Sequence, residues 1–218
     1  MLETLIQFDK QLLLFVNGSD SLFLDVLVRM LTTATTWIPF YVSLLYLVIR
    51  NSRSMKNIGL VLLCAGLCVL IAGAIDDAVV KPWVARWRPT HDPEIGHLVD
   101  VVNGYRSGKY GFFSAHASNT FSICVFFCLL VRNRLFSLAM IAWSLINCWT
   151  RLYLGVHFPG DILVGLLWGG LTGTGVYYFY RRITHYPRFL PYRSVDIDVV
   201  ISVLVLTVVC TIVRALIH

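Results

Sequence analysis

Long apolar runs separated by short polar stretches dominate the chain. Residues 57–75 and 162–180 contain no charged side chain, and each is close to the ~20 apolar residues that a helix needs to cross a bilayer. A lipid-exposed span must be a helix or part of a closed barrel, and unbroken apolar runs lack the alternation of a barrel strand. The pattern therefore predicts an all-α, polytopic membrane bundle.

Six such segments are separated by polar breaks, so we expect six transmembrane helices in a single domain, residues 1–218. The predicted spans cover residues 22–49, 57–80, 112–131, 135–153, 160–180 and 196–217.

The first segment, residues 2–16, has a different pattern. At helical spacing it places Leu5 and Leu12 on one face and Gln7 and Lys10 on the other. This predicts an N-terminal amphipathic helix that lies on the membrane surface instead of crossing it.

Small side chains inside the predicted spans indicate packing. Gly165, Gly169 and Gly173 recur every four residues, a spacing that lets two helices approach closely. All six cysteines lie in apolar segments, and pairs such as Cys64 and Cys68 have helical spacing instead of a CxxC spacing. We interpret the cysteines as buried packing residues.

Composition agrees with the hydropathy pattern. Only 14% of the residues are charged and 57% are hydrophobic, whereas soluble domains typically carry about 25% charged residues. The net charge of +6 comes mostly from basic residues in short loops between apolar runs. We therefore expect no nucleic-acid partner.

The basic loops predict the orientation. Loops 50–56, 132–134 and 181–195 are rich in Lys and Arg and fall on one side of a six-span chain, which the positive-inside rule assigns to the cytoplasm. Both termini, the long connection 81–111 and the stretch 150–160 then lie on the outer face.

Three polar stretches share this outer face. They are KPWVARWRP with Lys81 and Arg88, FSAH with Ser114 and His116, and TRLYLGVHFPGD with Arg151, His157 and Asp161. Ionisable residues at membrane depth are costly and usually functional. Taken singly each has a structural alternative, since Lys81 can pair with Asp77 and basic side chains near helix ends reach the interface. Their joint occurrence favours a shared site.

Phosphoryl transfer needs this set of groups. Fixed cations stabilise the charge on the transferring phosphoryl oxygens, and guanidiniums grip two oxygens at once. One histidine can attack phosphorus while a carboxylate holds its other nitrogen, and a second can protonate the leaving oxygen. No metal or other cofactor is required. Asp76 and Asp77, as helical neighbours, are expected to point apart and form no magnesium site.

The pattern K-x6-RP, S-x-H and R-x5-H-x3-D resembles the type 2 phosphatidic acid phosphatase superfamily, the lipid phosphate phosphatases. The resemblance covers residues 81–161 and the six-span layout. It implies that His157 is the nucleophile and forms a phosphohistidine, that Asp161 orients it, and that His116 is the general acid. It also implies a set of phosphate-binding residues: Lys81, Arg88, Ser114, Ala115 and Arg151.

The chain departs from the usual family pattern at a few positions. Phe113 and Ala115 stand where Pro and Gly are common, and Thr150 stands where Ser is usual. If the amide of residue 115 must approach the phosphate with a positive φ, an alanine there would be strained.

The resemblance implies a phosphorylated membrane lipid as substrate. Family substrates include undecaprenyl diphosphate, lipid A phosphates, phosphatidylglycerol phosphate and phosphatidic acid. An outer-facing site favours the first two, with the protein in a bacterial inner membrane and the site facing the periplasm. The segment 90–110 is expected to cap the site, with candidate head-group contacts at His91, His97, Arg106 and Lys109 and interfacial aromatics at Tyr105, Tyr110, Phe112 and Phe113.

Other functions remain open from the sequence. A lipid phosphotransferase would use the same residues and pass the phosphoryl group to another acceptor. A transporter or non-catalytic lipid-binding protein would use the cations alone, but the spacing of His157 and Asp161 has no purpose in simple binding. A soluble vanadium haloperoxidase has a similar anion site, and the apolar spans argue against it. The oligomeric state is not indicated.

Overall fold

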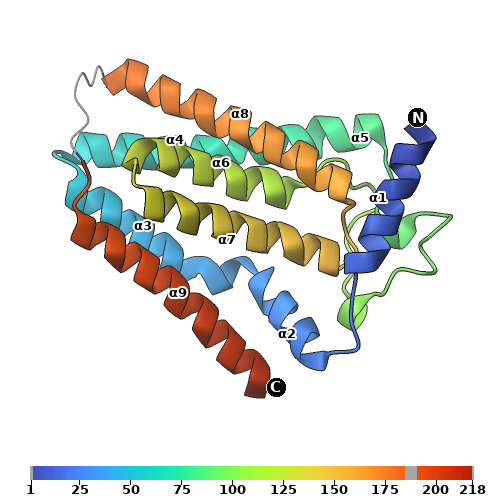
Figure 1. The fold of residues 1–218 in the computed structure, drawn as a ribbon. Helices are drawn as coiled ribbons and strands as arrows, with labels where there is room; N and C mark the ends of the chain where they lie inside the picture. The colour runs from blue at the N-terminus through green and yellow to red at the C-terminus, as the bar shows by residue number, and fades with distance from the viewer. Residues whose placement is uncertain (1, 185–190, 218) are drawn as a thin grey trace.

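The computed structural model describes residues 2–184 and 191–217, and within these ranges the regular structure is helical, with one isolated bridge between Trp87 and Tyr110. Long helices run side by side, and α1 crosses one end of the bundle (Figure 1). The elements are α1 (Leu2–Val16), α2 (Leu22–Leu31), η1 (Ala34–Trp37), α3 (Ile38–Asn51), α4 (Met55–Ile75), η2 (Asp76–Val80), α5 (Lys81–Val84), η3 (Pro89–His91), η4 (Val102–Gly104), α6 (Ala115–Val131), α7 (Arg134–Tyr153), α8 (Pro159–Thr184) and α9 (Ser194–Ile217).

The chain is an all-α polytopic membrane protein. Among the described residues, four continuous helical segments are long and apolar enough to cross a bilayer, and the bent pair of α2 and η1–α3 is a fifth candidate if it forms one span. Helix α6 is apolar but has only 17 residues. The span predicted over residues 112–131 is therefore a helix shorter than the ~20 residues of a full crossing.

The prediction of one long helix over residues 22–49 is wrong. The chain bends by 68° between α2 and the η1–α3 segment. Side chains in the bend satisfy carbonyls that the break frees: Thr36 Oγ1 donates to Met30 O over 2.7 Å, and Trp37 Nε1 donates to Leu31 O over 2.9 Å. Pro39, which has no amide hydrogen, follows at the start of α3. The bend matters for the site because it turns Thr32 toward it.

Helix α6 is packed closely against α8, and glycine makes this approach possible. A Cβ atom on Gly165, Gly169 or Gly173 would lie 2.8, 2.5 or 2.4 Å from the backbone oxygen of a serine on α6, respectively. These serines, at positions 114, 118 and 122, share the four-residue spacing of the glycines. The packing interpretation is confirmed, and this contact fixes the start of α6 against the start of α8.

Four of the six cysteines are buried as predicted, whereas Cys128 is partly buried and Cys210 is exposed. All are free thiols, and Cys64, Cys68, Cys124 and Cys148 are buried between helices. Cys210 on α9 is exposed on the apolar surface.

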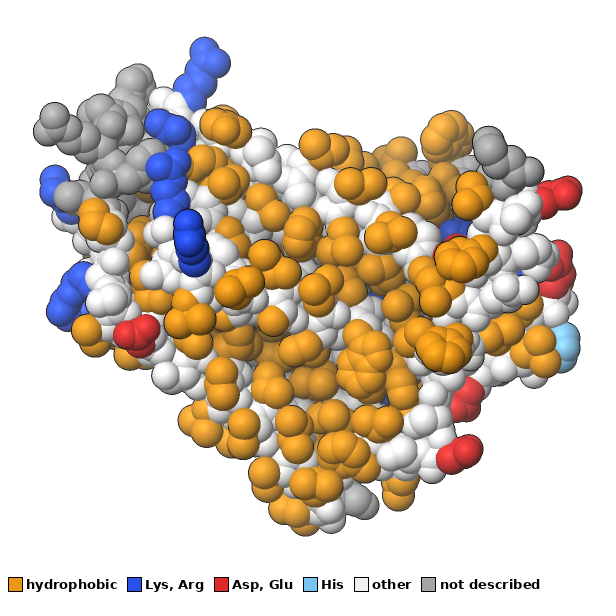
Figure 2. All heavy atoms as spheres, viewed as in Figure 1, with side chains coloured by type: hydrophobic (Ala, Val, Ile, Leu, Met, Phe, Trp, Pro, Cys, Tyr) orange, Lys and Arg blue, Asp and Glu red, His pale blue; other side chains and the backbone are white. Residues whose placement is uncertain are grey.

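Charge separates the two ends of the molecule. Figure 2 shows most of the visible Lys and Arg side chains at the end where α4 and α7 begin, most of the visible Asp and Glu at the opposite end, and hydrophobic side chains over the middle. The predicted basic loops lie at the first end, although Arg188 falls outside the described residues. Lys81, Arg88, His116 and His157 lie at the second end, where α5, α1 and the loop 85–114 meet (Figure 1).

Helix α1 contacts the protein through residues of both predicted faces. Lys10, predicted on the polar face, and Leu13 are buried, while Leu5, Phe8 and Phe15 are exposed. Lys10 Nζ lies 3.3 Å from Asp92 and 2.8 Å from Glu94. Lys10 and the buried Leu13 therefore join α1 to the loop over the site, while Leu5, Phe8 and Phe15 face outward.

Candidate active site

The predicted residues converge at one end of the bundle, from three segments far apart in sequence. His157, in the connection between α7 and α8, is 2% exposed. Burial, and then the positive charges of Arg88, Arg151 and Lys81, lowers the pKa of His157 well below its usual 6.5. The same cations act electrostatically on His116. The imidazole of His157 is therefore neutral at physiological pH.

The hydrogen bond at His157 assigns its tautomer. Arg88 Nη1 lies 2.9 Å from His157 Nε2, and a guanidinium has only donors. Nε2 must therefore carry the lone pair, and the ring proton is on Nδ1. That nitrogen lies 3.7 Å from Oδ2 of Asp161. The lone pair of Nε2 thus points toward Arg88, and Nδ1–H is buried near the carboxylate without a hydrogen-bond partner among the described residues.

Two buried arginines lack a carboxylate partner. Arg88 and Arg151 are 6% and 2% exposed, and no salt bridge joins either to an acidic residue in the described part of the chain. Their Nε atoms are buried without a hydrogen-bond partner among the same residues. Burial and the charge of Arg151 lower the pKa of Arg88 below its usual 12.5. Two close guanidiniums with open donors form a site for an anion.

Arg151 is held by residues that the sequence interpretation missed or placed elsewhere. Its Nη1 donates to Thr32 Oγ1 over 2.7 Å and to the Tyr105 hydroxyl over 3.2 Å. Tyr105, expected as an interfacial aromatic, also lies 5.1 Å below the guanidinium of Arg29. No local sequence pattern marks Thr32 or Tyr105 as a partner of Arg151, because only the bend after α2 and the fold of the loop bring them to it.

Lys81 differs from the arginines because it is paired. Its Nζ lies 2.8 Å from Asp76 Oδ2 and also contacts Asp77. The prediction that these two carboxylates point apart is wrong. The turn η2 is π-helical, which brings residues five apart onto one face, and such turns often occur at functional sites. Asp76 Oδ1 also accepts a hydrogen bond from the amide of Phe113 over 3.1 Å, so it ties Lys81 to the start of α6.

The start of α6 lies at the same site. Ser114 is its N-cap, with Oγ accepting from the amide of Ala117, and its own amide donates to Asp161 O over 3.1 Å. Ala115 is the first residue of the helix and is not among the positive-φ residues. The backbone strain that a positive φ would impose on an alanine at this position is therefore absent. The first amides of a helix lack intrahelical partners and favour anions.

His116 borders a cavity of about 250 Å³ that reaches the apolar surface. Tyr41 on α3 and Val69 on α4, both in its lining, are each 38% exposed. The cavity is lined by Thr32, Ala34, Trp37, Tyr41, Val69, His116, Asn119, Thr120, Ile123, Trp143 and Asn147. The cavity therefore extends from His116 toward the apolar surface between α3 and α4.

Asp161 has a partner that sequence reasoning missed. Arg86 Nη1 lies 2.7 Å from Asp161 Oδ1, and Arg86 Nη2 lies 2.6 Å from Asp9 Oδ2 on α1. Asp161 Oδ2 also accepts from the amide of Phe158 over 2.9 Å. Arg86 lies inside the first motif, two positions before Arg88, and this position could have identified it as a site residue from the sequence. Asp9 had none, because only the fold brings α1 to this end.

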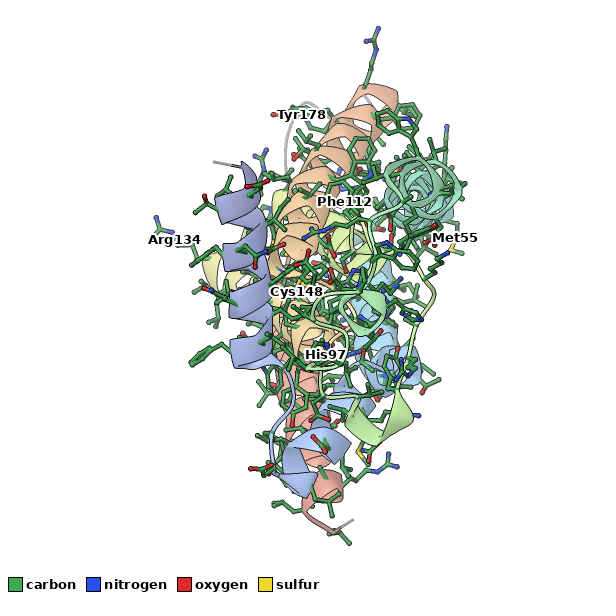
Figure 3. All side chains as sticks on the ribbon, turned by 90° about the vertical axis from the view of Figure 1, so that its right-hand side faces the viewer. Met55, His97, Phe112, Arg134, Cys148 and Tyr178 are labelled. Carbon is green, nitrogen blue, oxygen red and sulfur yellow. The ribbon has the colours of Figure 1, made fainter. Side chains whose placement is uncertain are left out.

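The loop residues proposed as head-group contacts are only partly near the site. Figure 3 views this end of the molecule, with α1 along one side and Phe112 and His97 labelled in the loop region. His97 is exposed, Arg106 donates to Thr90 O over 3.4 Å, and Lys109 lies 4.4 Å above the Trp87 ring. Phe113, expected at the interface, is buried.

A metal site is not evident in the described residues, which contain no group of three or more His, Cys, Asp or Glu side chains that could hold an ion. The observed arrangement is instead a buried cationic pocket beside a neutral histidine, at the end of a membrane bundle.

Comparison with known proteins identifies the class. The family model of the PAP2 superfamily matches residues 60–185. The chain is 38% identical over 186 residues to a lipid A 4'-phosphatase of Bacteroides thetaiotaomicron, which covers 84% of this chain and 82% of the relative. It is 32% identical over 188 residues to a lipid A 4'-phosphatase of Porphyromonas gingivalis, covering 83% and 77%. No solved structure matches. The chain belongs to the PAP2 superfamily and is a membrane lipid phosphatase, a phosphoric ester hydrolase.

Proposed function

We propose that this protein hydrolyses the 4'-phosphate monoester of lipid A through a phosphohistidine at His157. The observation that carries the chemistry is the pair of buried arginines without carboxylate partners, Arg88 and Arg151, beside a histidine whose Nε2 lone pair points toward Arg88. The substrate follows from the printed names of the two relatives.

Phosphate binding uses charges and donors already in place. Arg88 and Arg151 grip the phosphate oxygens through their open donors, and Lys81 adds a charge from the opposite side. The amides of Ala115 and His116, at the start of α6, face the same anion. Ser114 Oγ accepts from Ala117, which leaves its hydroxyl hydrogen for a phosphate oxygen.

The reaction has two steps. His157 Nε2 attacks phosphorus, the bond between phosphorus and the sugar oxygen breaks, and His116 gives that oxygen a proton. The imidazole gains a positive charge as Nε2 becomes phosphorylated, and the negative carboxylate of Asp161 stabilises this charge beside Nδ1–H. Water then attacks phosphorus while His116 takes a water proton, the N–P bond breaks, and inorganic phosphate leaves with neutral His157 restored.

The lateral cavity supports a lipid as the leaving group. His116, the proposed acid, borders it, and its mouth lies between Tyr41 and Val69 on the apolar surface. A lipid whose phosphate lies among the cations can therefore leave its remaining body in the cavity and its acyl chains in the bilayer.

We also propose a topology with six spans in one domain, residues 1–218, in which α6 is a short sixth span. The basic loops face the cytoplasm by the positive-inside rule, so the site faces the periplasm of a bacterial inner membrane. Helix α1 lies in the outer interface with Leu5, Phe8 and Phe15 toward the lipid, since these side chains are exposed.

The test is phosphate release by purified protein in detergent from lipid A, undecaprenyl diphosphate, phosphatidylglycerol phosphate and phosphatidic acid, with excess chelator. We expect release from lipid A that leaves the 1-phosphate in place and is absent in His157→Ala. Release from another lipid of the panel instead of lipid A would identify that lipid as the substrate. Transfer to an added lipid or sugar without free phosphate would show a phosphotransferase, and loss of activity with chelator would contradict a metal-free mechanism.

A further inference from the structure

Arg86 lies between two carboxylates, Asp9 and Asp161, that are far apart in the sequence. Its Nη1 is 2.7 Å from Asp161 Oδ1, and its Nη2 is 2.6 Å from Asp9 Oδ2. The side chain of Asp161 is fully buried, and those of Arg86 and Asp9 are 26% and 15% exposed. The Arg86 guanidinium also lies 4.4 Å above the ring of Phe158. These contacts hold the guanidinium in one orientation.

Asp9 also contacts the helix that carries Asp161. Its Oδ1 accepts a hydrogen bond from the amide of Gly160 over 2.7 Å, in the first turn of α8. A carboxylate at this position satisfies an open amide and is favoured by the helix dipole. Asp9 therefore holds both Arg86 and the backbone beside Asp161.

Charge explains why Asp161 needs this arrangement. In the proposed reaction Asp161 must stay negative to stabilise the charge on His157 as phosphorus binds Nε2. Arg86 at 2.7 Å favours the ionised form of Asp161, but alone it would also cancel the negative charge that acts on His157. Asp9 offsets that positive charge, so the group Asp9–Arg86–Asp161 keeps one net negative charge that faces His157. The strongest charge effects on His157 come from Arg88, Arg151 and Lys81, which are all positive.

We propose that Asp9 is a positioning residue of the active site and acts on His157 through Arg86 and Asp161. Helix α1, outside the three sequence motifs, thereby becomes part of the catalytic architecture. This inference rests on the proposed function, because the state of Asp161 matters only if His157 is the nucleophile.

The chain offers a matched control on the same helix. Lys10, the next residue, also joins α1 to the body of the protein, through Asp92 and Glu94, but it has no contact with Arg86 or Asp161. If α1 acts only as a docked helix, Asp9→Asn and Lys10→Gln should have similar effects. If Asp9 acts through charge, only Asp9→Asn should slow the reaction.

The experiment measures kcat and KM in detergent with the lipid that the wild type hydrolyses. Loss of one charge-assisted contact predicts a fall in kcat of about 10- to 100-fold for Asp9→Asn, with KM within about twofold. Asp9→Glu should recover part of this loss, and Lys10→Gln should stay within about twofold of wild type. In an Arg86→Gln background, Asp9→Asn should add less than about twofold, because its intermediary is gone.

Equal losses in Asp9→Asn and Lys10→Gln, or full additivity of Asp9→Asn with Arg86→Gln, would overturn the inference. Thermal midpoints are measured for all variants, so that a loss of activity caused by unfolding is distinguished from a loss caused by the altered charge. An inactive wild type would instead contradict the proposed function, so the two failures are distinguishable.

Discussion

Arg88 donates a hydrogen bond to Nε2 of His157 over 2.9 Å in a pocket that also contains the positive charge of Arg151. The bond directs the lone pair of a neutral histidine toward the place where the arginines can hold an anion. Arg88 is itself fixed by a second bond, from Nη1 to Val156 O over 2.9 Å. One side chain therefore aligns the proposed nucleophile with the proposed anion site.

Replacing Arg88 by lysine should impair catalysis although the charge is kept. An ammonium group lacks the planar fork that contacts His157, Val156 O and a phosphate oxygen together. We expect kcat/KM to fall about 10- to 100-fold, measured by phosphate release. Arg134→Lys, an exposed residue at the opposite end of the bundle, is the control and should match wild type. Equal activity of both variants would contradict the proposed role of Arg88.

A covalent phosphoenzyme should be trapped when the reaction with radiolabelled lipid is quenched at alkaline pH. His157→Asn should give no label, because no other nitrogen takes the position of Nε2. His116→Ala should retain label longer than wild type when the leaving group is a good one, since the base for the second step is missing. Labelling of His157→Asn at the wild-type level would exclude His157 as the nucleophile.

Acid should destabilise the wild type more than a variant without His157. The pKa of His157 is lowered below 6.5 in the folded protein, so the unfolded chain binds this proton first as the pH falls. The stability due to the neutral ring is present above pH ~6.5 and is lost below it, at about 1.4 kcal/mol per pH unit. Thermal midpoints between pH 7.5 and 5 should fall less for His157→Asn than for wild type.

An exposed histidine supplies the comparison for this measurement. His97→Asn should keep the wild-type difference between the two pH values, because the ring of His97 is exposed. If His157→Asn and His97→Asn have the same acid response, the buried neutral histidine is not the cause.

A methyl group on the α8 glycine stripe should destabilise the bundle. The Cβ of Gly169→Ala would lie 2.5 Å from Ser118 O, which is backbone and has little freedom to move. Overpacking of this kind typically costs about 1–3 kcal/mol, so the thermal midpoint in detergent should fall. Gly175→Ala, on the same helix with no atom within 4 Å of the added group, should show no loss. The reverse order would contradict the close contact between α6 and α8.

The proposed orientation predicts which loops are accessible from outside the cell. With the exposed Cys210 replaced by serine, a cysteine at position 97 should react with an impermeant thiol reagent in intact cells. A cysteine at position 55, where the methionine is 80% exposed at the other end, should react only after lysis. The opposite pattern would place the site on the cytoplasmic side.

Much of the architecture could be predicted because it depends on local pattern. Apolar runs such as 57–75 are long enough to require a membrane, and the recurrence of Gly169 with its neighbours predicts a close helix contact whatever the partner. The spacing of Arg151, His157 and Asp161 likewise defines the family motif. These features follow from hydrocarbon thickness, helical periodicity and the chemistry of phosphate, which act on neighbouring residues in the chain.

Other features follow from the tertiary structure alone. The bend at Thr32 and the π-helical turn at Asp76 contradict predictions that assumed regular helices. Both depend on contacts made by side chains in the folded protein, which a local sequence pattern does not contain. The contact of Asp9 with Arg86 joins segments that share no periodicity. The sequence by itself determined the membrane class, the packing stripe and the reactive groups. Only the packed bundle decided which carboxylates surround Lys81, which residues hold Arg151 and which carboxylate balances Arg86, since electrostatic partners are set by distance in space and not along the chain.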